Sequence, residues 1–354
     1  MKVLFNLPPS IIERCFRKSD LDRLAAEHEV RLPDFSAGGA FAEFAAKGER
    51  SDQASESAAL KRFVQEHLTE AEAMVTGWEM IPVTAEDVAA AKNLRLIVHS
   101  AGSVKRLVAE EAWKRGIRVA TCNEALAIGV AETTLGMILC GLKGIFPARE
   151  WSRAGHWHDP KLGTPRDVVR ELYQVTIGVI SASKVGLHLL RLLRAFEVEV
   201  LLYDPYVTPE RAKELGATLV ELDELVRRST VVTLHAPSLP ATRHLLKGGH
   251  FRAMQDGAIF INTARGAIVD ETAMIEELKR GRITAFIDVT DPEPPAKDNP
   301  LRTLPNVILT PHLAGHVTNG CRRQGRSAVD QVFEFAANRP MRGEVTLEML
   351  AQMG

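Results

Sequence analysis

The sequence predicts an α/β protein of two domains, each built on a parallel sheet with helices on both faces. The length of 354 residues is typical of about two domains. Short runs rich in Val, Ile and Leu alternate with helical patterns, and apolar strands without polar alternation are typical of sheets buried on both faces. A stretch rich in Pro, Gly and charge, residues 151–170, separates two such blocks.

The expected elements follow from these runs. The strands are Val3–Phe5, Ala73–Thr76, Leu94–His99, Arg118–Thr121, Thr176–Ile180, Glu199–Tyr203, Val231–His235, Ala258–Asn262, Ala285–Val289 and Val307–Thr310. The helices include Asp20–His28, a long apolar helix Ile128–Ile145, Gly186–Phe196, Glu271–Arg280 and Asn319–Asn338. The last helix is expected to return to the first block, giving one domain of residues 1–122 plus 319–354 and a second of 123–318.

Composition excludes several classes of protein. Lys and Arg number 44 and Asp and Glu 45, a net charge of −1, so no general attraction to nucleic acid or to an anionic membrane is expected. The longest uncharged apolar run, Thr133–Leu142, is shorter than the ~18 residues of a membrane span. Pro8 and Pro9 interrupt the N-terminal apolar stretch, which argues against a signal peptide. The 4 cysteines are scattered, so we expect reduced thiols and a soluble, cytoplasmic protein.

A nucleotide-binding signal lies where the strand Thr176–Ile180 meets the following helix. The turn reads S-A-S-K-V-G over residues 181–186, and Asp204 ends the next strand. In a Rossmann domain such a turn presents backbone N–H groups to a pyrophosphate, and the acid accepts the ribose hydroxyls. Asp204 favours NAD over NADP, because a carboxylate repels a 2′-phosphate.

The turn departs from the G-x-G-x-x-G pattern. Only Gly186 is in place, and Ser181 and Ser183 replace the first two glycines. Serine is small enough for a phosphate to approach, with its hydroxyl as a further donor. The alternative from this turn alone is an ordinary strand-to-helix connection capped by serine.

Three downstream motifs resemble the D-isomer-specific 2-hydroxyacid dehydrogenase family. They are N-T-A-R-G-A-I-V-D over residues 262–270, D-V-T-D-P-E-P over residues 288–294 and T-P-H-L-A-G over residues 310–315. Further matches are L-H-A-P at 234–237, V-A-E at 130–132 and Y-D-P-Y at 203–206, and the likeness runs from about Leu94 to Gly315. The resemblance implies two Rossmann-like or flavodoxin-like domains with an active-site cleft between them.

The resemblance also implies a catalytic set. His312 would act as acid and base, Glu293 would pair with its imidazole, and Arg265 would bind the substrate carboxylate and polarise the carbonyl. Asp291, two residues before Glu293, is the competing partner for His312. Asp288 would lie near the nicotinamide carboxamide.

Cofactor and substrate contacts are implied in the same way. The cofactor residues would be Ser183, Lys184, Val185, Asp204, His235, Ala236, Pro237, Thr242, Thr263, Ala264, Asp288 and Gly315. The substrate residues would be Ala101, Gly102 and Ser103, whose loop resembles the family's G-A-G-V-D, together with Trp78. Lys105 and Arg106 stand where the family usually carries Asp and Asn, which either makes the site more positive or leaves both side chains in water.

Other polar residues carry weaker signals. The run H-W-H-D at 156–159 resembles part of a metal site, but a surface loop is the simpler interpretation, and no metal is expected. His316 follows His312 by four residues and is a candidate border of the cleft, whereas His188 lies in the helix after the phosphate turn, where packing is the simpler role.

The resemblance therefore predicts an NAD-dependent oxidoreductase that interconverts a D-2-hydroxy acid and a 2-keto acid. A homodimer with contacts in the Val130–Ile145 region is the family expectation. A formate dehydrogenase is disfavoured, because those enzymes carry glutamine where Glu293 stands. An NAD-sensing protein resembling the family's corepressors remains the alternative, since such proteins retain the three catalytic residues and the S-A-S turn favours a weakened site.

Overall fold

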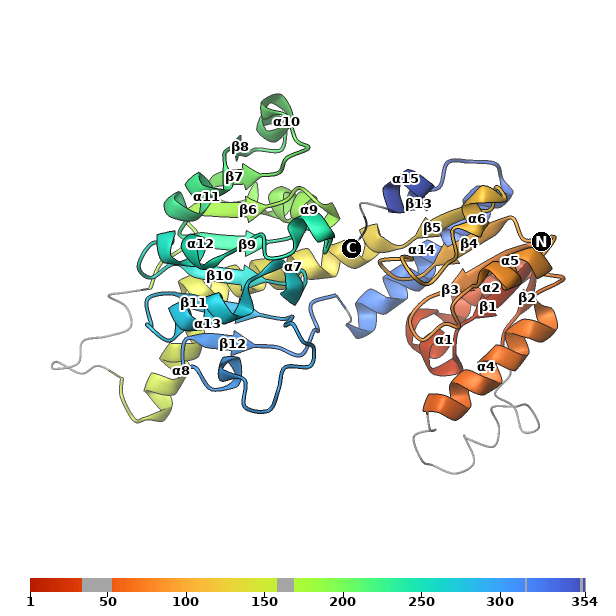
Figure 1. Ribbon diagram of the computed structural model, residues 1–354, viewed down its shortest axis with the longest axis horizontal. Helices are drawn as coiled ribbons and strands as arrows, with labels where there is room; N and C mark the ends of the chain where they lie inside the picture. The colour runs from red at the N-terminus through yellow and green to blue at the C-terminus, as the bar shows by residue number, and fades with distance from the viewer. Residues whose placement is uncertain (34–52, 158–168, 316, 351–352, 354) are drawn as a thin grey trace. The chain divides into compact units, whose positions relative to one another are not determined.

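The computed structural model describes residues 1–33, 53–157, 169–315, 317–350 and 353 (Figure 1). The chain forms two compact units: unit 1 is Met1–Leu126 with His316–Gly354, and unit 2 is Ala127–Gly315. Unit 1 is therefore assembled from both ends of the chain. The boundaries expected from the sequence, after residues 122 and 318, lie a few residues from these.

Unit 2 contains a seven-stranded sheet in which every ladder is parallel. Its spatial order is β12 (Val307–Leu309), β11 (Thr284–Ile287), β10 (Ile259–Asn262), β9 (Val231–Leu234), β6 (Thr176–Ile180), β7 (Glu199–Tyr203) and β8 (Thr218–Leu219). This is the Rossmann order extended by one strand. From β6 the chain adds strands toward one edge of the sheet and from β9 toward the other edge, so the strand order reverses between β6 and β9. Ligands of such sheets bind at the carboxyl ends of the strands near that reversal.

Two apolar layers cover the sheet of unit 2. One contains α7 (Asn123–Leu142), α9 (Lys184–Leu193) and α10 (Pro209–Glu214), and the other contains α11 (Leu222–Arg228), α12 (Gly248–Ala253) and α13 (Glu271–Leu278). The strand β10 alternates between them, with Ile259 and Ile261 in the first layer and Phe260 in the second. Each such fully buried side chain contributes about 1.5–3 kcal/mol.

Unit 1 contains a six-stranded sheet with one antiparallel edge. Its order is β13 (Glu344–Val345), β5 (Arg118–Thr121), β4 (Leu96–His99), β3 (Ala73–Thr76), β1 (Lys2–Asn6) and β2 (Glu29–Arg31), and only β13 runs antiparallel. Without β13 this is the flavodoxin-like order. One face packs on α4 (Gln53–His67), α5 (Ala85–Ala90) and α6 (Glu111–Lys114), and the other on α1 (Pro9–Cys15), α2 (Lys18–Glu27) and α14 (Thr318–Ala336). The short helix α15 (Leu347–Leu350) follows β13.

The predicted fold class is confirmed, since both units are α/β domains on parallel sheets. All ten expected strands are present, with bounds that differ by at most two residues at either end. The expected helix Ile128–Ile145 is wrong in its bounds, because α7 ends at Leu142 and α8 (Ile145–Arg153) follows. Gly144, with φ of 57°, makes the break between them in the left-handed region that glycine adopts readily.

One helix in the described part of the chain, α7, is long and apolar enough to cross a membrane by length and composition alone. Core helices of folded domains pass the same test. Ala131, Ile138 and Leu142 of this helix are buried in the core of unit 2, which gives its apolar character a structural role.

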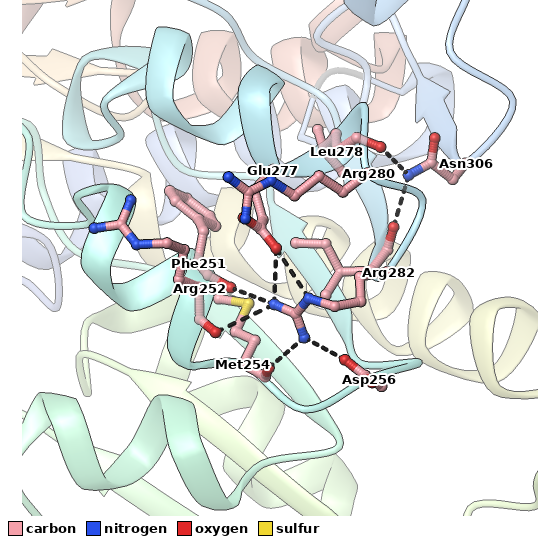
Figure 2. Close-up of polar contacts among 10 residues, drawn as sticks. Phe251, Arg252, Met254, Asp256, Glu277, Leu278, Arg280, Arg282 and Asn306 are labelled. Atoms are coloured by element: carbon pink, nitrogen blue, oxygen red, sulfur yellow. Dashed lines mark hydrogen bonds and ion pairs between the residues drawn. The ribbon is translucent and has the colours of Figure 1, made fainter.

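At the amino ends of β10 and β11, Arg282 joins three segments of unit 2 (Figure 2). Its guanidinium donates to Glu277 Oε1 from Nε at 3.0 Å and from Nη2 at 2.9 Å, and to Asp256 Oδ1 from Nη1 at 2.6 Å. Three further bonds reach the carbonyl oxygens of Phe251, Arg252 and Met254. Glu277 is only 3% exposed, and Arg282 is its main partner, with two hydrogen bonds to a carboxylate whose burial as an unpaired charge would be costly.

Candidate active site

Three side chains follow three neighbouring parallel strands of unit 2. Arg265 follows β10, Glu293 follows β11 and His312 follows β12, and these strands are adjacent in the sheet. Parallel strands bring their carboxyl ends to one edge, so residues far apart in the sequence meet there. The order of the motifs along the chain thus becomes the order of the residues along the sheet edge.

His312 and Glu293 form a hydrogen-bonded pair. Nδ1 of His312 lies 2.5 Å from Oε1 of Glu293, and both side chains are partly exposed. With Nδ1 engaged by the carboxylate, Nε2 is the ring nitrogen left to exchange a proton with a ligand. Asp291 pairs instead with Arg243, at 3.5 Å, and its backbone N–H donates to Glu271. The structure therefore brings Glu293 to His312 and directs Asp291 elsewhere.

The backbone of His312 is held in an uncommon conformation. Its φ is 49°, in the left-handed region that non-glycine residues rarely adopt. Asp288 holds the surrounding loop: its carboxylate accepts bonds from Thr310 Oγ1 at 2.6 Å, Leu313 N at 3.0 Å and Ala314 N at 3.0 Å. Its carbonyl also accepts from His312 N at 2.9 Å. These bonds over-determine the loop and fix the direction in which the imidazole leaves it.

The anchoring role of Asp288 is a contribution that sequence reasoning did not identify. The expected role, close to a nicotinamide carboxamide, stays a prediction. A signal was present in the sequence, because an acid directly after a buried strand must satisfy its oxygens locally.

Arg265 sits in a loop shaped by Asn262. The Asn262 side chain donates to Arg265 O at 3.1 Å and accepts from Ala264 N at 3.0 Å. The position after Arg265 has room only for a glycine, because a Cβ on Gly266 would lie 2.0 Å from the carbonyl carbon of Thr290. In the described chain the Arg265 guanidinium makes a single hydrogen bond, to Ala264 O at 2.6 Å, and it is exposed. Most of its donors are therefore available for an anion.

A pocket of about 440 Å³ adjoins the His312–Glu293 pair within unit 2. Apolar and polar groups both line it. The lining residues include Asp288, Thr290, Pro294, Arg302 and Thr310. The pair is thus accessible to small molecules and water from this unit alone.

The turn after β6 has the geometry of a phosphate site. Ser183 caps α9, its hydroxyl accepting from Gly186 N at 3.4 Å. Across the described residues, the amides of Lys184 and Val185 have no hydrogen-bond partner at this helix N-terminus. A Cβ on Gly186 would lie 2.1 Å from Ser181 O, so the turn closes as tightly as a dinucleotide-binding turn does. These features fit an NAD pyrophosphate.

Further along the same edge, several expected cofactor residues shape their own loops. Nδ1 of His235 is buried and has no hydrogen-bond partner in the described part of the chain, whereas Nε2 lies 2.9 Å from the hydroxyl of Thr233. Thr242 Oγ1 accepts from Leu239 N at 2.9 Å and donates to Pro237 O at 2.5 Å, and Ala236 is buried. A contact of His235, Ala236, Pro237 or Thr242 with the cofactor stays a prediction.

The hydroxyl of Thr263 bonds to Thr134 of α7 at 3.1 Å, and that side chain is buried. Ala264 lies in the Arg265 loop, and Gly315 is the last residue of unit 2. For these three residues a contact with the cofactor stays a prediction.

The expected substrate loop lies in unit 1, after β4. Ser100 N donates to Thr76 O at 2.7 Å and Cys122 N donates to Ala101 O at 3.0 Å, so the loop is tied to both neighbouring strands. Gly102 and Ser103 are partly exposed. Lys105 Nζ bonds to Met353 O at 3.1 Å, and Arg106 is exposed.

Trp78, the other expected substrate residue, is partly buried against the core layer of unit 1 that contains Phe5 and α14. A role in the substrate pocket stays a prediction. His316, His158 and Asp159 lie outside the described residues. Within the described ranges, no group of three or more His, Cys, Asp or Glu side chains could hold a metal ion.

Two buried histidines at these strand ends predict an acid-sensitive fold. Burial lowers the pKa of His99 to about 4 and that of His235 to about 3. In the unfolded chain both titrate near pH ~6.5. Below that pH the unfolded state binds protons that the folded state does not. Stability should therefore fall by about 1.4 kcal/mol per pH unit for each histidine, until the folded pKa is reached.

Urea unfolding of the wild type and of His99→Asn, at about pH 7.5 and about pH 5.5, measures this effect. Asparagine keeps a polar group for Thr76, which lies 3.0 Å from His99 Nδ1. The variant should lose less stability between the two pH values than the wild type. An equal loss in both proteins would contradict the assignment.

Comparisons with known proteins agree with this geometry. Residues 135–314 match the family model described as D-isomer specific 2-hydroxyacid dehydrogenase, NAD binding domain. The chain is 36% identical over 266 residues to D-3-phosphoglycerate dehydrogenase of Archaeoglobus fulgidus, covering 75% of this chain and 50% of that protein. It is 32% identical over 255 residues to hydroxypyruvate reductase of Thermotoga maritima, covering 71% of this chain and 81% of that protein.

The solved TT0316 protein from Thermus thermophilus superposes with a TM-score of 0.71 at 28% identity, covering 98% of this chain and 100% of that one. The chain spans about half the length of the phosphoglycerate dehydrogenases that it matches. The family model covers unit 2 from α7 to the His312 loop, including the turn and the strand ends described above, and NAD is the cofactor of that domain. The chain belongs to the D-isomer specific 2-hydroxyacid dehydrogenase family.

Proposed function

We propose that the protein is an NAD-dependent oxidoreductase that interconverts a D-2-hydroxy acid and a 2-keto acid. The observation that carries the proposal is the His312–Glu293 contact of 2.5 Å, whose two residues and Arg265 follow three adjacent strands of an NAD-binding domain. Relatives named D-3-phosphoglycerate dehydrogenase and hydroxypyruvate reductase support a small carboxylic acid as substrate.

The chain's own residues would divide the work as follows. Bound NAD(H) supplies the hydride acceptor or donor. Arg265 binds the substrate carboxylate and polarises the carbonyl oxygen through its planar fork of donors. His312 takes the hydroxyl proton at Nε2 during oxidation and returns it during reduction, while Glu293 fixes the ring through Nδ1. Asp288 holds the His312 loop in place.

Turnover tests this proposal directly. The purified protein is assayed with NADH and a panel of 2-keto acids, including glyoxylate, hydroxypyruvate and a branched-chain keto acid, with formate and NAD as a separate reaction. Oxidation of NADH with at least one keto acid, and none of formate, is expected. NADH binding without turnover across the whole panel would favour the NAD-sensing alternative.

We propose that the protein is a cytoplasmic homodimer. The apolar side chains Leu139, Ile145 and Phe146 of α7 and α8 are 38%, 50% and 41% exposed, which supports a subunit contact near that end of α7. The four cysteines are free thiols, in keeping with a reducing compartment. Sedimentation equilibrium measures the oligomeric state, and a monomer would contradict the proposed dimer. Cell fractionation measures the location, and recovery in a membrane or extracellular fraction would contradict the proposed cytoplasmic location.

A further inference from the structure

The first residue of the phosphate turn, Ser181, is held in a left-handed backbone conformation. Its φ is 79°, which a serine adopts only at a conformational cost. Its N–H donates to Tyr203 O at 2.8 Å, and its carbonyl oxygen lies where a Cβ on Gly186 would be 2.1 Å away. The backbone is thus fixed on both sides, and glycine would fit here without strain. The contacts of the serine hydroxyl offer a reason for a side chain at this strained position.

That hydroxyl contacts the acid at the end of the next strand. Ser181 Oγ lies 3.2 Å from Asp204 Oδ2, and the same oxygen accepts from Ala182 N at 2.8 Å. Oδ1 accepts from Tyr206 N at 2.9 Å. The register of β6 and β7, with Ile180 opposite Tyr203, places the turn and the acid side by side. Three donors therefore hold one carboxylate from within unit 2.

These contacts determine what the carboxylate can still bind. A carboxylate oxygen accepts about two hydrogen bonds, so Oδ2 is saturated by Ser181 and Ala182. Oδ1 has one partner and keeps a lone pair for a hydroxyl group. A carboxylate held in this way cannot rotate away from an approaching phosphate. The repulsion between the two negative charges is therefore not relieved by movement of the side chain.

We propose that Ser181 is a positioning residue that orients Asp204 toward the adenosine ribose of NAD(H) and strengthens discrimination against NADP(H). The proposal rests on the NAD-dependent function proposed above. Serine stands here at the position of the first glycine of the G-x-G-x-x-G turn, where glycine serves only to allow the left-handed backbone conformation. The cost in backbone strain is offset by an ordered carboxylate at the ribose site.

Two substitutions separate the hydroxyl from the backbone. Ser181→Gly relieves the strain and removes the hydroxyl, and Ser181→Ala keeps the strain and removes the hydroxyl. Calorimetric titration with NADH and NADPH should show the Kd for NADH raised about 5-fold in both variants, and the preference for NADH over NADPH reduced. The melting temperature should rise in Ser181→Gly and not in Ser181→Ala. Greater stability combined with weaker NADH binding is a pattern that a purely structural serine would not produce.

A double-mutant cycle with Asp204→Ala completes the test. In that background Ser181→Gly should change the Kd for NADH no further, because the hydroxyl acts through the carboxylate. Wild-type NADH affinity in Ser181→Gly, or an undiminished effect in the Asp204→Ala background, would overturn the positioning role alone. Failure of the wild type to bind NADH at all would overturn the proposed function and this inference with it.

Discussion

Replacing His312 with alanine is expected to lower kcat for keto acid reduction about 10³-fold, because the imidazole exchanges the substrate proton. The affinity for NADH should change little, since His312 bonds to Glu293 and not to the phosphate turn. Steady-state kinetics and calorimetric titration measure the two quantities.

Two further substitutions identify the partner of the imidazole. Glu293→Gln keeps the shape of the side chain but removes its charge, and it should lower kcat about 10-fold or more. Asp291→Asn is the matched control, because Asp291 pairs with Arg243, and it should leave kcat within about 2-fold of the wild type. If Asp291→Asn lowers kcat more than Glu293→Gln does, the wrong acid has been assigned. Wild-type rates in His312→Ala would remove the basis of the enzymatic proposal.

The largest loss of stability is expected from Arg282→Ala. The substitution removes six hydrogen bonds and leaves the Glu277 carboxylate, which is 3% exposed, without its main partner (Figure 2). Breaking such a buried pair costs about 3–5 kcal/mol, most of it from the charge left behind. Urea unfolding at neutral pH measures the free energy of unfolding.

Arg280 provides a matched control at the same carboxylate. Its Nη1 lies 3.4 Å from Glu277 Oε2, but its side chain is 63% exposed. Arg280→Ala should therefore cost less than about 1 kcal/mol. Adding Glu277→Gln to Arg282→Ala should recover part of the loss, because the unpaired charge is removed. Equal losses from Arg280→Ala and Arg282→Ala would show that the buried pair does not dominate.

Local patterns predicted the strands well, because parallel strands buried on both faces leave continuous apolar runs. The three strands that were missed lack this signal. β2 has the sequence Glu-Val-Arg, and β8 and β13 contain two residues each. Such segments become strands because they pair with a neighbour in the sheet, and their own composition does not favour a strand. β13 also pairs with a strand more than 200 residues earlier, and no local window contains that information.

The same division holds in the candidate site. Glu293 and His312 were paired from motifs, and the structure brings their side chains together. The bonds from Asp288 to residues 310, 313 and 314 were not foreseen, since they depend on how two loops meet at the sheet edge. The left-handed backbone of Ser181 was also missed, because the sequence shows that serine replaces glycine but not that it retains the glycine conformation.

The assembly of unit 1 from both ends of the chain has a consequence for synthesis on the ribosome. The sheet of unit 1 is completed only when Gln331 bonds to Thr121 O and β13 pairs with β5. At about 5–20 residues per second, the ribosome needs about 10–40 s to make the intervening residues 127–315. Throughout that time the apolar layer around Cys15 and Ile12 lacks its α14 partner, whereas the sequence of unit 2 is complete before α14 is made. The nascent N-terminal segment is therefore the part of this chain most in need of chaperones, and unit 2 is expected to fold first.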